Sequence, residues 1–172
     1  MGNEGDEIAL FSAIFLKEWV FMSSFKGSFS YAVDSKGRIN IPAKMRKNIS
    51  PEANDQFVVT RGYESCLFLY PYDEWLKLEQ TIRKLSPSDP KHRFFTRTLL
   101  EHATEAQLDG QFRIMIPKEL LQFAKIDNEV RILGILERIE VWNPQVYEEY
   151  KAAQNETYEN VAAAVMKTSV QE

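Results

Sequence analysis

Short runs of alternating apolar and polar residues recur along the chain and are typical of half-buried β-strands. Eight alternating or more densely apolar runs stand at residues 28–33, 38–41, 57–60, 66–70, 104–108, 113–116, 130–133 and 139–142. Pro42 and Pro117 each follow a run and predict the start of a short helix, because the fixed φ of proline suits the first helical turn. The order strand, turn, strand, helix and two strands therefore occurs twice.

The two halves of the chain also share a sequence string, D-x-x-x-R-I-x-I-P. Asp34 and Asp109 begin its two copies and lie 75 positions apart, as do Arg38 and Arg113. The aspartates can accept hydrogen bonds from the backbone ahead of them, and Gly37 can adopt positive φ, so all three are predicted to form turns. An internal repeat of this kind predicts an α+β fold with a pseudo-two-fold repeat.

Helical spacing of apolar residues predicts two helices between the copies, at residues 73–85 and 91–102. A further helix is expected from Pro144, and it is expected to fray beyond Gln154, where large apolar residues are few. We divide the chain into an N-terminal extension, a first β domain, a helical linker, a second β domain and a helical, partly disordered acidic tail. Their limits are residues 1–27, 28–75, 76–103, 104–147 and 148–172.

The N-terminal extension contains an apolar run at residues 8–16 that differs in composition from the rest of the chain. A membrane-spanning helix needs about twenty apolar residues, and a signal peptide opens with basic residues rather than the acidic ones found here. Two interpretations stay open. Residues 8–21 form a short docked helix, or Met22 is the natural start, because Lys17 and Glu18 can be encoded by a ribosome-binding sequence at a suitable distance.

Two motifs, D-x-K-G-R-x-x-I-P and L-x-x-Y-P-x-x-E-W, follow one another in the first half. They comprise Asp34, Lys36, Gly37, Arg38, Ile41 and Pro42, then Leu67, Tyr70, Pro71, Glu74 and Trp75. Across residues 25–150 the sequence resembles the MraZ family. The resemblance implies two tandem SpoVT/AbrB-like β domains of swapped-hairpin, double-psi-like topology with short helices, assembled into a ring oligomer. It also implies a bacterial repressor that binds direct repeats in double-stranded promoter DNA of its own division and cell-wall operon.

The same resemblance places the family's DNA-contacting arginine on Arg38. Residues 34–47 hold five basic residues and one acidic residue, whereas residues 109–122 hold two of each. Positive charge concentrated on one segment is typical of a DNA-binding surface, even in a protein of formal net charge −4. The alternative role for Arg38 is an ion pair with Asp34 across the turn. The predicted DNA-binding residues are Arg38, Lys36, Arg46, Lys44 and Arg113.

The second copy departs from the family pattern at Phe112, where the family usually has glycine. Phenylalanine is strained at positive φ, so we expect the second turn to differ in shape from the first. The first copy is therefore expected to dominate the contact with DNA, with Arg113 contributing less than Arg38.

Composition argues against several other classes. The chain has one cysteine and two histidines among its 172 residues, so neither a disulfide framework nor a zinc cluster is expected. It has no phosphate loop, nucleophile elbow, zinc-protease motif or dinucleotide-binding fingerprint. We expect no cofactor, metal, small-molecule substrate, membrane contact or enzymatic activity, and a location in the cytoplasm at the nucleoid. The competing hypotheses are an oligomeric assembly protein that does not bind DNA and an enzyme with an acidic pocket.

Overall fold

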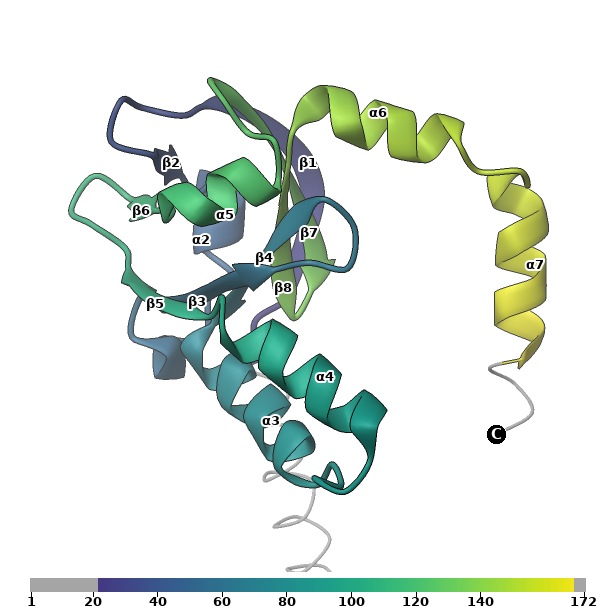
Figure 1. Ribbon diagram of the computed structural model, residues 1–172. Coiled ribbons are helices and arrows are strands. Elements are labelled where there is room, and N and C mark those ends of the chain that lie inside the picture. The colour runs from purple at the N-terminus through teal and green to yellow at the C-terminus, as the bar shows by residue number, and fades with distance from the viewer. Residues whose placement is uncertain (1–21, 169–172) are drawn as a thin grey trace, which may run out of the picture.

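Figure 1 shows a computed structural model of the chain, in which residues 22–168 are described. The two interpretations of residues 8–21 given above lie outside this part. The described residues form two antiparallel sheets with short helices packed around them, which confirms the predicted α+β class. Among the described helices, none is long and apolar enough to cross a membrane.

Six strands form one antiparallel sheet in the order β1-β7-β8-β4-β3-β5. They are β1 (Phe25–Ala32), β3 (Gln56–Arg61), β4 (Cys66–Pro71), β5 (Thr104–Gln107), β7 (Glu129–Leu136) and β8 (Arg138–Trp142). Two further strands, β2 (Arg38–Asn40) and β6 (Arg113–Met115), pair with each other and form a two-stranded ribbon. These eight strands of the described residues correspond to the eight predicted runs.

The strands of the two copies interleave instead of forming separate sheets. Strand β1 of the first copy pairs with β7 of the second, and β5 of the second pairs with β3 of the first. Read from either edge, the sheet presents equivalent strands in the same order, and β4 and β8 pair at its centre. This is the pseudo-two-fold repeat that the sequence predicts, with the swapped hairpins that the resemblance to the MraZ family implies. The domain limits at residues 28–75 and 104–147 stay predictions.

Apolar residues of both copies fill the core beneath the ribbon. Ile39 and Ile114 are partners in the β2–β6 register and are fully buried together with Leu67 and Leu69 of β4. The alternate residues of β4, such as Phe68, pack into a second cluster under the helices, so every residue of this central strand is buried. Burying one such side chain stabilises a fold by about 1.5–3 kcal/mol. The core therefore fixes the ribbon firmly on the large sheet.

Short helices follow β2 and β6, and a helical hairpin separates the copies. These helices are α2 (Ala43–Arg46), α5 (Lys118–Phe123), α3 (Tyr72–Arg83) and α4 (Pro90–Leu100), with a single 3-10 turn at Pro51–Ala53. Helices α3 and α4 project together from β3 and β4 (Figure 1). Asp89 caps α4 by accepting a hydrogen bond from the Lys91 backbone N–H at 2.7 Å.

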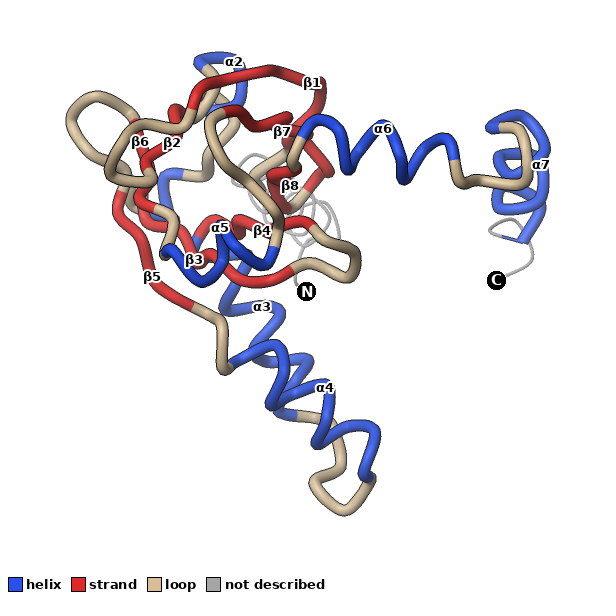
Figure 2. Tube along the Cα trace, turned by 45° about the horizontal axis from the view of Figure 1, so that its top comes forward, coloured by secondary structure: helices blue, strands red, loops and turns tan. Residues whose placement is uncertain are grey.

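The C-terminal part of the chain leaves the body of the molecule. Helices α6 (Pro144–Ala152) and α7 (Tyr158–Thr168) extend to one side in both views (Figures 1 and 2). Residues beyond Gln154, where the chain is expected to fray, form α7, which carries three consecutive alanines at residues 162–164; the partly disordered tail stays a prediction. Alanine favours helix intrinsically and compensates for the scarcity of large apolar residues.

Candidate nucleic-acid interface

The first turn, between β1 and β2, is built around the carboxylate of Asp34. Its Oδ1 accepts hydrogen bonds from the backbone N–H groups of Lys36 and Arg38, both at 2.9 Å. The Gly37 N–H donates to the Asp34 carbonyl at 2.9 Å, and Gly37 adopts a φ of 76°. These bonds give the backbone N–H groups of a tight turn their acceptors without the hydrogen bonds of a β-sheet.

The second turn, between β5 and β6, repeats these bonds around Asp109. Its Oδ1 accepts from the N–H groups of Gln111 and Arg113, again both at 2.9 Å. The Phe112 N–H donates to the Asp109 carbonyl at 2.8 Å, and Phe112 adopts a φ of 61° in the place of Gly37. The expectation that this turn differs in shape is therefore wrong. The aspartate bonds hold Phe112 in the left-handed region despite its Cβ atom.

The two turns bring two aspartates and two arginines into one cluster. Arg38 Nε lies 2.7 Å from Asp34 Oδ2, and Arg113 Nε and Nη2 both lie 2.9 Å from Asp109 Oδ2. Across the pseudo-two-fold axis, each arginine also has an Nη1 atom 3.9 Å from the opposite aspartate. The ion pair with Asp34, the alternative role of Arg38, is therefore present and uses its Nε, while its role in DNA contact stays a prediction. The closest contact between Arg38 and its aspartate is 2.7 Å, and the closest between Arg113 and its aspartate is 2.9 Å.

The hydrogen bonds lower the pKa of both carboxyl groups. The pKa of Asp34 falls from 3.8 to about 2, chiefly because the Arg38 backbone N–H donates to it, with further help from the Arg38 side chain. The pKa of Asp109 is also lowered, and there the side-chain hydrogen bond from Arg113 is the largest cause. Both carboxylates are therefore ionised at neutral pH and hold their arginines in place.

We expect Asp34→Asn to flatten the pH dependence of stability between about pH 4 and pH 2. The Asp34 carboxylate stabilises the fold fully above its ordinary pKa of 3.8, and this stabilisation is lost as the pH falls through the folded-state pKa of about 2. Asparagine keeps an oxygen that can accept the backbone bonds but does not titrate. Urea unfolding of both proteins at a series of pH values measures the difference. Parallel pH profiles would contradict the role assigned to this carboxylate.

The outer face of the ribbon carries side chains that the sequence-based prediction missed. Arg38 pairs with Met115, and Asn40 pairs with Arg113, while the isoleucines between them point into the core. Asn40 and Met115 are both exposed. The period-two alternation of each strand already indicated this outward face, because residues two apart lie on the same side. The pairing of the two strands is what brings the four side chains together.

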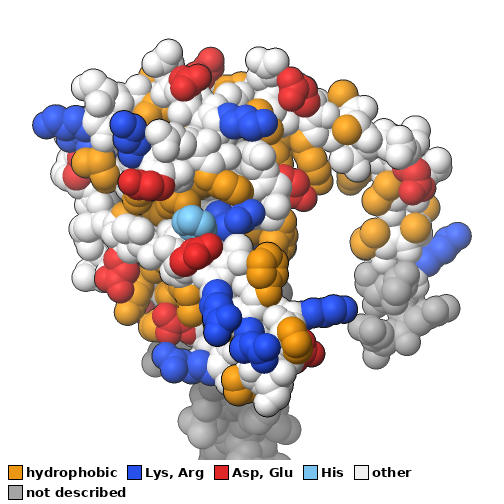
Figure 3. Space-filling view, in the orientation of Figure 1, with side chains coloured by type: hydrophobic (Ala, Val, Ile, Leu, Met, Phe, Trp, Pro, Cys, Tyr) orange, Lys and Arg blue, Asp and Glu red, His pale blue; other side chains and the backbone are white. Residues whose placement is uncertain are grey.

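The remaining predicted cations lie on the first copy. Lys36 and Lys44 are exposed, and Arg46 is half-buried with its guanidinium carbon Cζ 3.8 Å from the centre of the Phe112 ring. Their counterparts 75 positions later are Gln111, Glu119 and Leu121, none of them basic. The turns before β2 and β6 lie at one end of the molecule, opposite the α3–α4 hairpin (Figures 1 and 2). Lys and Arg side chains gather at this end and again over the hairpin (Figure 3).

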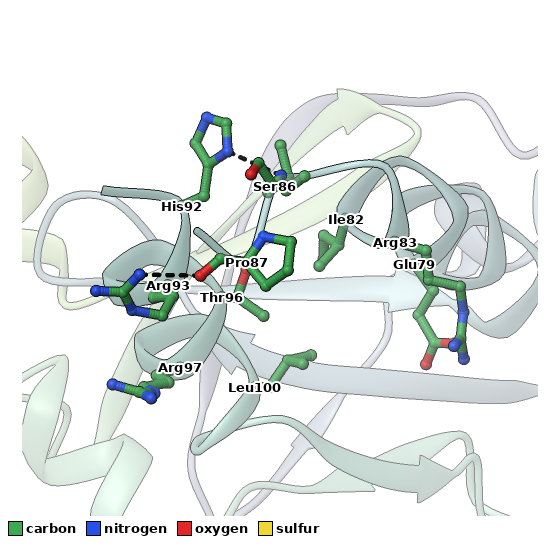
Figure 4. Close-up of a pocket in the computed structure, with 11 residues that line it drawn as sticks. Glu79, Ile82, Arg83, Ser86, Pro87, His92, Arg93, Thr96, Arg97 and Leu100 are labelled. Carbon is green, nitrogen blue, oxygen red and sulfur yellow. Dashed lines mark hydrogen bonds and ion pairs between the residues drawn. The ribbon is translucent and has the colours of Figure 1, made fainter. Parts of the chain in front are cut away.

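A hollow of about 580 Å³ lies between α3 and α4, away from the turns. One cation of its lining, Arg93, is engaged with the loop that joins the two helices: Arg93 Nη1 donates to the carbonyls of Pro87 and Ser88 at 2.9 and 3.0 Å. His92 Nδ1 accepts from the Ser86 N–H at 3.0 Å (Figure 4). We therefore assign these side chains to the hairpin loop. Within residues 22–168, no group of three His, Cys, Asp or Glu residues could hold a metal ion.

Known proteins resemble this chain over most of its length. The family model for the MraZ protein matches it twice, at residues 24–98 and 99–168. The transcriptional regulator MraZ of Halothermothrix orenii is 43% identical over 141 residues, which cover 82% of this chain and 96% of that protein. The transcriptional regulator MraZ of Natranaerobius thermophilus is 38% identical over 142 residues, with coverages of 83% and 96%. The chain therefore belongs to the MraZ family of transcriptional regulators.

Proposed function

We propose that this chain represses transcription of its own division and cell-wall operon by binding direct repeats in the promoter. It acts as a cytoplasmic, nucleoid-associated protein, and several copies in a ring present their turns to the DNA together. The single observation that carries this proposal is the β2–β6 ribbon, whose two aspartate-braced turns stand at a free end of the molecule. A two-stranded ribbon fits the major groove of B-DNA, which is about 12 Å wide.

The contacts divide by what each side chain can recognise. Arg38 lies on the outward face of the ribbon, and its terminal Nη1 atom lies 3.9 Å from Asp109, a long contact that it can exchange for a base of the DNA. An arginine fork of this kind can bond the O6 and N7 atoms of guanine. Lys36, Lys44 and Arg46 flank the ribbon and suit phosphates, which fix the register of a protein on DNA but carry no sequence information. Arg113 contributes less, because it lies in a segment without net charge.

Salt dependence tests this function directly. A protein that neutralises phosphates loses affinity as salt rises, with a log–log slope of about −0.9 per phosphate. Fluorescence anisotropy with labelled DNA from upstream of the gene should give a steep slope. Lys36→Gln should lower affinity for all sequences alike and reduce the slope by about 1. The competing hypothesis, an assembly protein without DNA binding, requires that no salt concentration reveals any affinity for this DNA.

Glu159→Gln offers a matched control for Lys36→Gln. Glu159 lies on α7, far from the turns in both views (Figures 1 and 2), and its substitution raises the net charge by one where Lys36→Gln lowers it by one. Its effect on the slope should be small, because exposed charges separated by more than a Debye length, about 8 Å at physiological salt, are largely screened. Slope changes of equal size and opposite sign in the two variants would assign binding to overall charge and contradict a specific contact by Lys36.

A further inference from the structure

The two halves of the molecule differ at one pair of facing positions near the ribbon. In one half, Gly37 lies against Leu121: a Cβ atom at Gly37 would stand 3.1 Å from Leu121 Cδ1. In the other half, Phe112 stands 75 positions after Gly37, and Arg46 stands 75 positions before Leu121. The Arg46 Cζ atom lies 3.8 Å from the centre of the Phe112 ring. The pseudo-two-fold axis thus relates a small apolar contact to an aromatic–arginine stack.

The backbone at Phe112 is strained, and burial of its ring does not compensate for the strain. L-residues other than glycine seldom adopt a φ of 61°, because Cβ crowds the following carbonyl. The Phe112 side chain remains 48% exposed, so it contributes little to the core. A strained residue that the fold does not need for packing indicates a functional constraint. The contact that accounts for the ring is its stack with Arg46.

Arg46 is held from two sides. Its guanidinium lies over the Phe112 ring, and its Nη1 donates to the Ile41 carbonyl at 3.2 Å. A cation over an aromatic face is attracted by the ring quadrupole. An arginine already fixed in one orientation loses less side-chain entropy when it binds a phosphate than a mobile one does. Stack and hydrogen bond together therefore preorganise Arg46 beside the first turn.

We propose that Phe112 is a positioning residue that presents Arg46, on the other copy of the repeat, to a DNA phosphate. The second turn then supports DNA binding indirectly, through its aromatic side chain, while the first copy supplies the charge. This inference rests on the proposed function. It explains why Phe112 stands where Gly37 stands in the first copy: the partner of Phe112 is a cation, whereas the partner of Gly37 is the apolar Leu121.

Replacement of Phe112 by leucine and by tyrosine separates stacking from backbone strain. Both variants keep a Cβ atom at positive φ, so their thermal unfolding midpoints should be similar, but only tyrosine keeps an aromatic face. Phe112→Leu should lower the affinity for promoter DNA about three- to tenfold, and Phe112→Tyr should stay within about twofold of the wild type. In an Arg46→Ala background, Phe112→Leu should lower the affinity no further. Phe112→Gly should bind as weakly as Phe112→Leu without a lower unfolding midpoint, because glycine relieves the strain.

The outcomes distinguish this inference from the function on which it rests. A wild-type protein that binds no promoter DNA would overturn both. If the wild type binds, the inference alone fails when Phe112→Leu keeps wild-type affinity, or when Phe112→Tyr loses as much affinity as Phe112→Leu. It also fails when Phe112→Leu weakens binding equally with and without Arg46, because the ring would then act through another group.

Discussion

Arg38→Ala is expected to reduce affinity for promoter DNA by about a hundredfold or more while leaving the folded assembly intact. A good bidentate contact between an arginine and a base is worth about 1–3 kcal/mol of binding free energy. Every subunit bound to a DNA repeat loses this contact at once. The substitution also leaves the carboxylates of Asp34 and Asp109 without one of their two counter-charges, so they repel the DNA backbone. The fold should survive, because the turn is braced by backbone bonds to Asp34 Oδ1 that alanine preserves.

Arg113→Ala is the matched control, since the pseudo-two-fold axis relates the two arginines. Arg113 is as exposed as Arg38, with side-chain exposures of 23% and 25%, but it lies in a segment without net charge. Its loss should weaken binding less. Titrations at equal salt and circular dichroism check both variants. If Arg38→Ala binds within about threefold of the wild type, the role assigned to Arg38 is wrong. If Arg113→Ala loses more affinity than Arg38→Ala, the second turn and not the first dominates the contact with DNA.

The repeated string made most of the fold predictable. Two copies of D-x-x-x-R-I-x-I-P fix where turns, strands and short helices fall, and the alternation within each strand indicates that Ile39 and Ile114 point inward. Alternation does not identify a strand's partner. The exchange of β1 and β5 between the copies follows from the resemblance to a family rather than from the period of the pattern. Strand β1 begins at Phe25 because it pairs with β7 along eight residues, and the mostly exposed residues of this edge strand carry little apolar signal.

The candidate site was predictable only in part. Charge and spacing identified the arginines and the aspartates that brace them, because Asp34 and Arg38 lie close in sequence. The contacts between Arg38 and Asp109, and between Arg46 and Phe112, join residues about 70 positions apart and depend on the tertiary pairing of β2 with β6. The prediction of an altered second turn failed because it considered only the strain that the Cβ atom of Phe112 causes at positive φ. It left out the hydrogen bonds that hold the turn in this shape. Three hydrogen bonds around Asp109 outweigh that strain.

Affinity should also depend on the helical phase of the DNA repeats. Each subunit offers one small basic turn, so tight binding requires the turns of several subunits. Contacts linked in this way can raise the overall affinity by a factor of about 10²–10⁴. In the proposed ring, neighbouring turns would face one side of the DNA. Their target elements should therefore recur about every 10–10.5 bp, the spacing at which the same groove returns to that side.

Inserting about 5 bp between two repeats rotates one of them to the far side of the duplex, and binding should fall towards the level of a single repeat. Inserting about 10 bp restores the phase and should harm binding less, because the linked contacts can again form together. Affinities measured on a series of otherwise identical DNAs, lengthened one base pair at a time, would reveal this oscillation. A DNA carrying one repeat supplies the lower limit. If affinity instead fell smoothly with spacer length, without a helical period, the subunits would bind independently. The ring would then have no part in recognition.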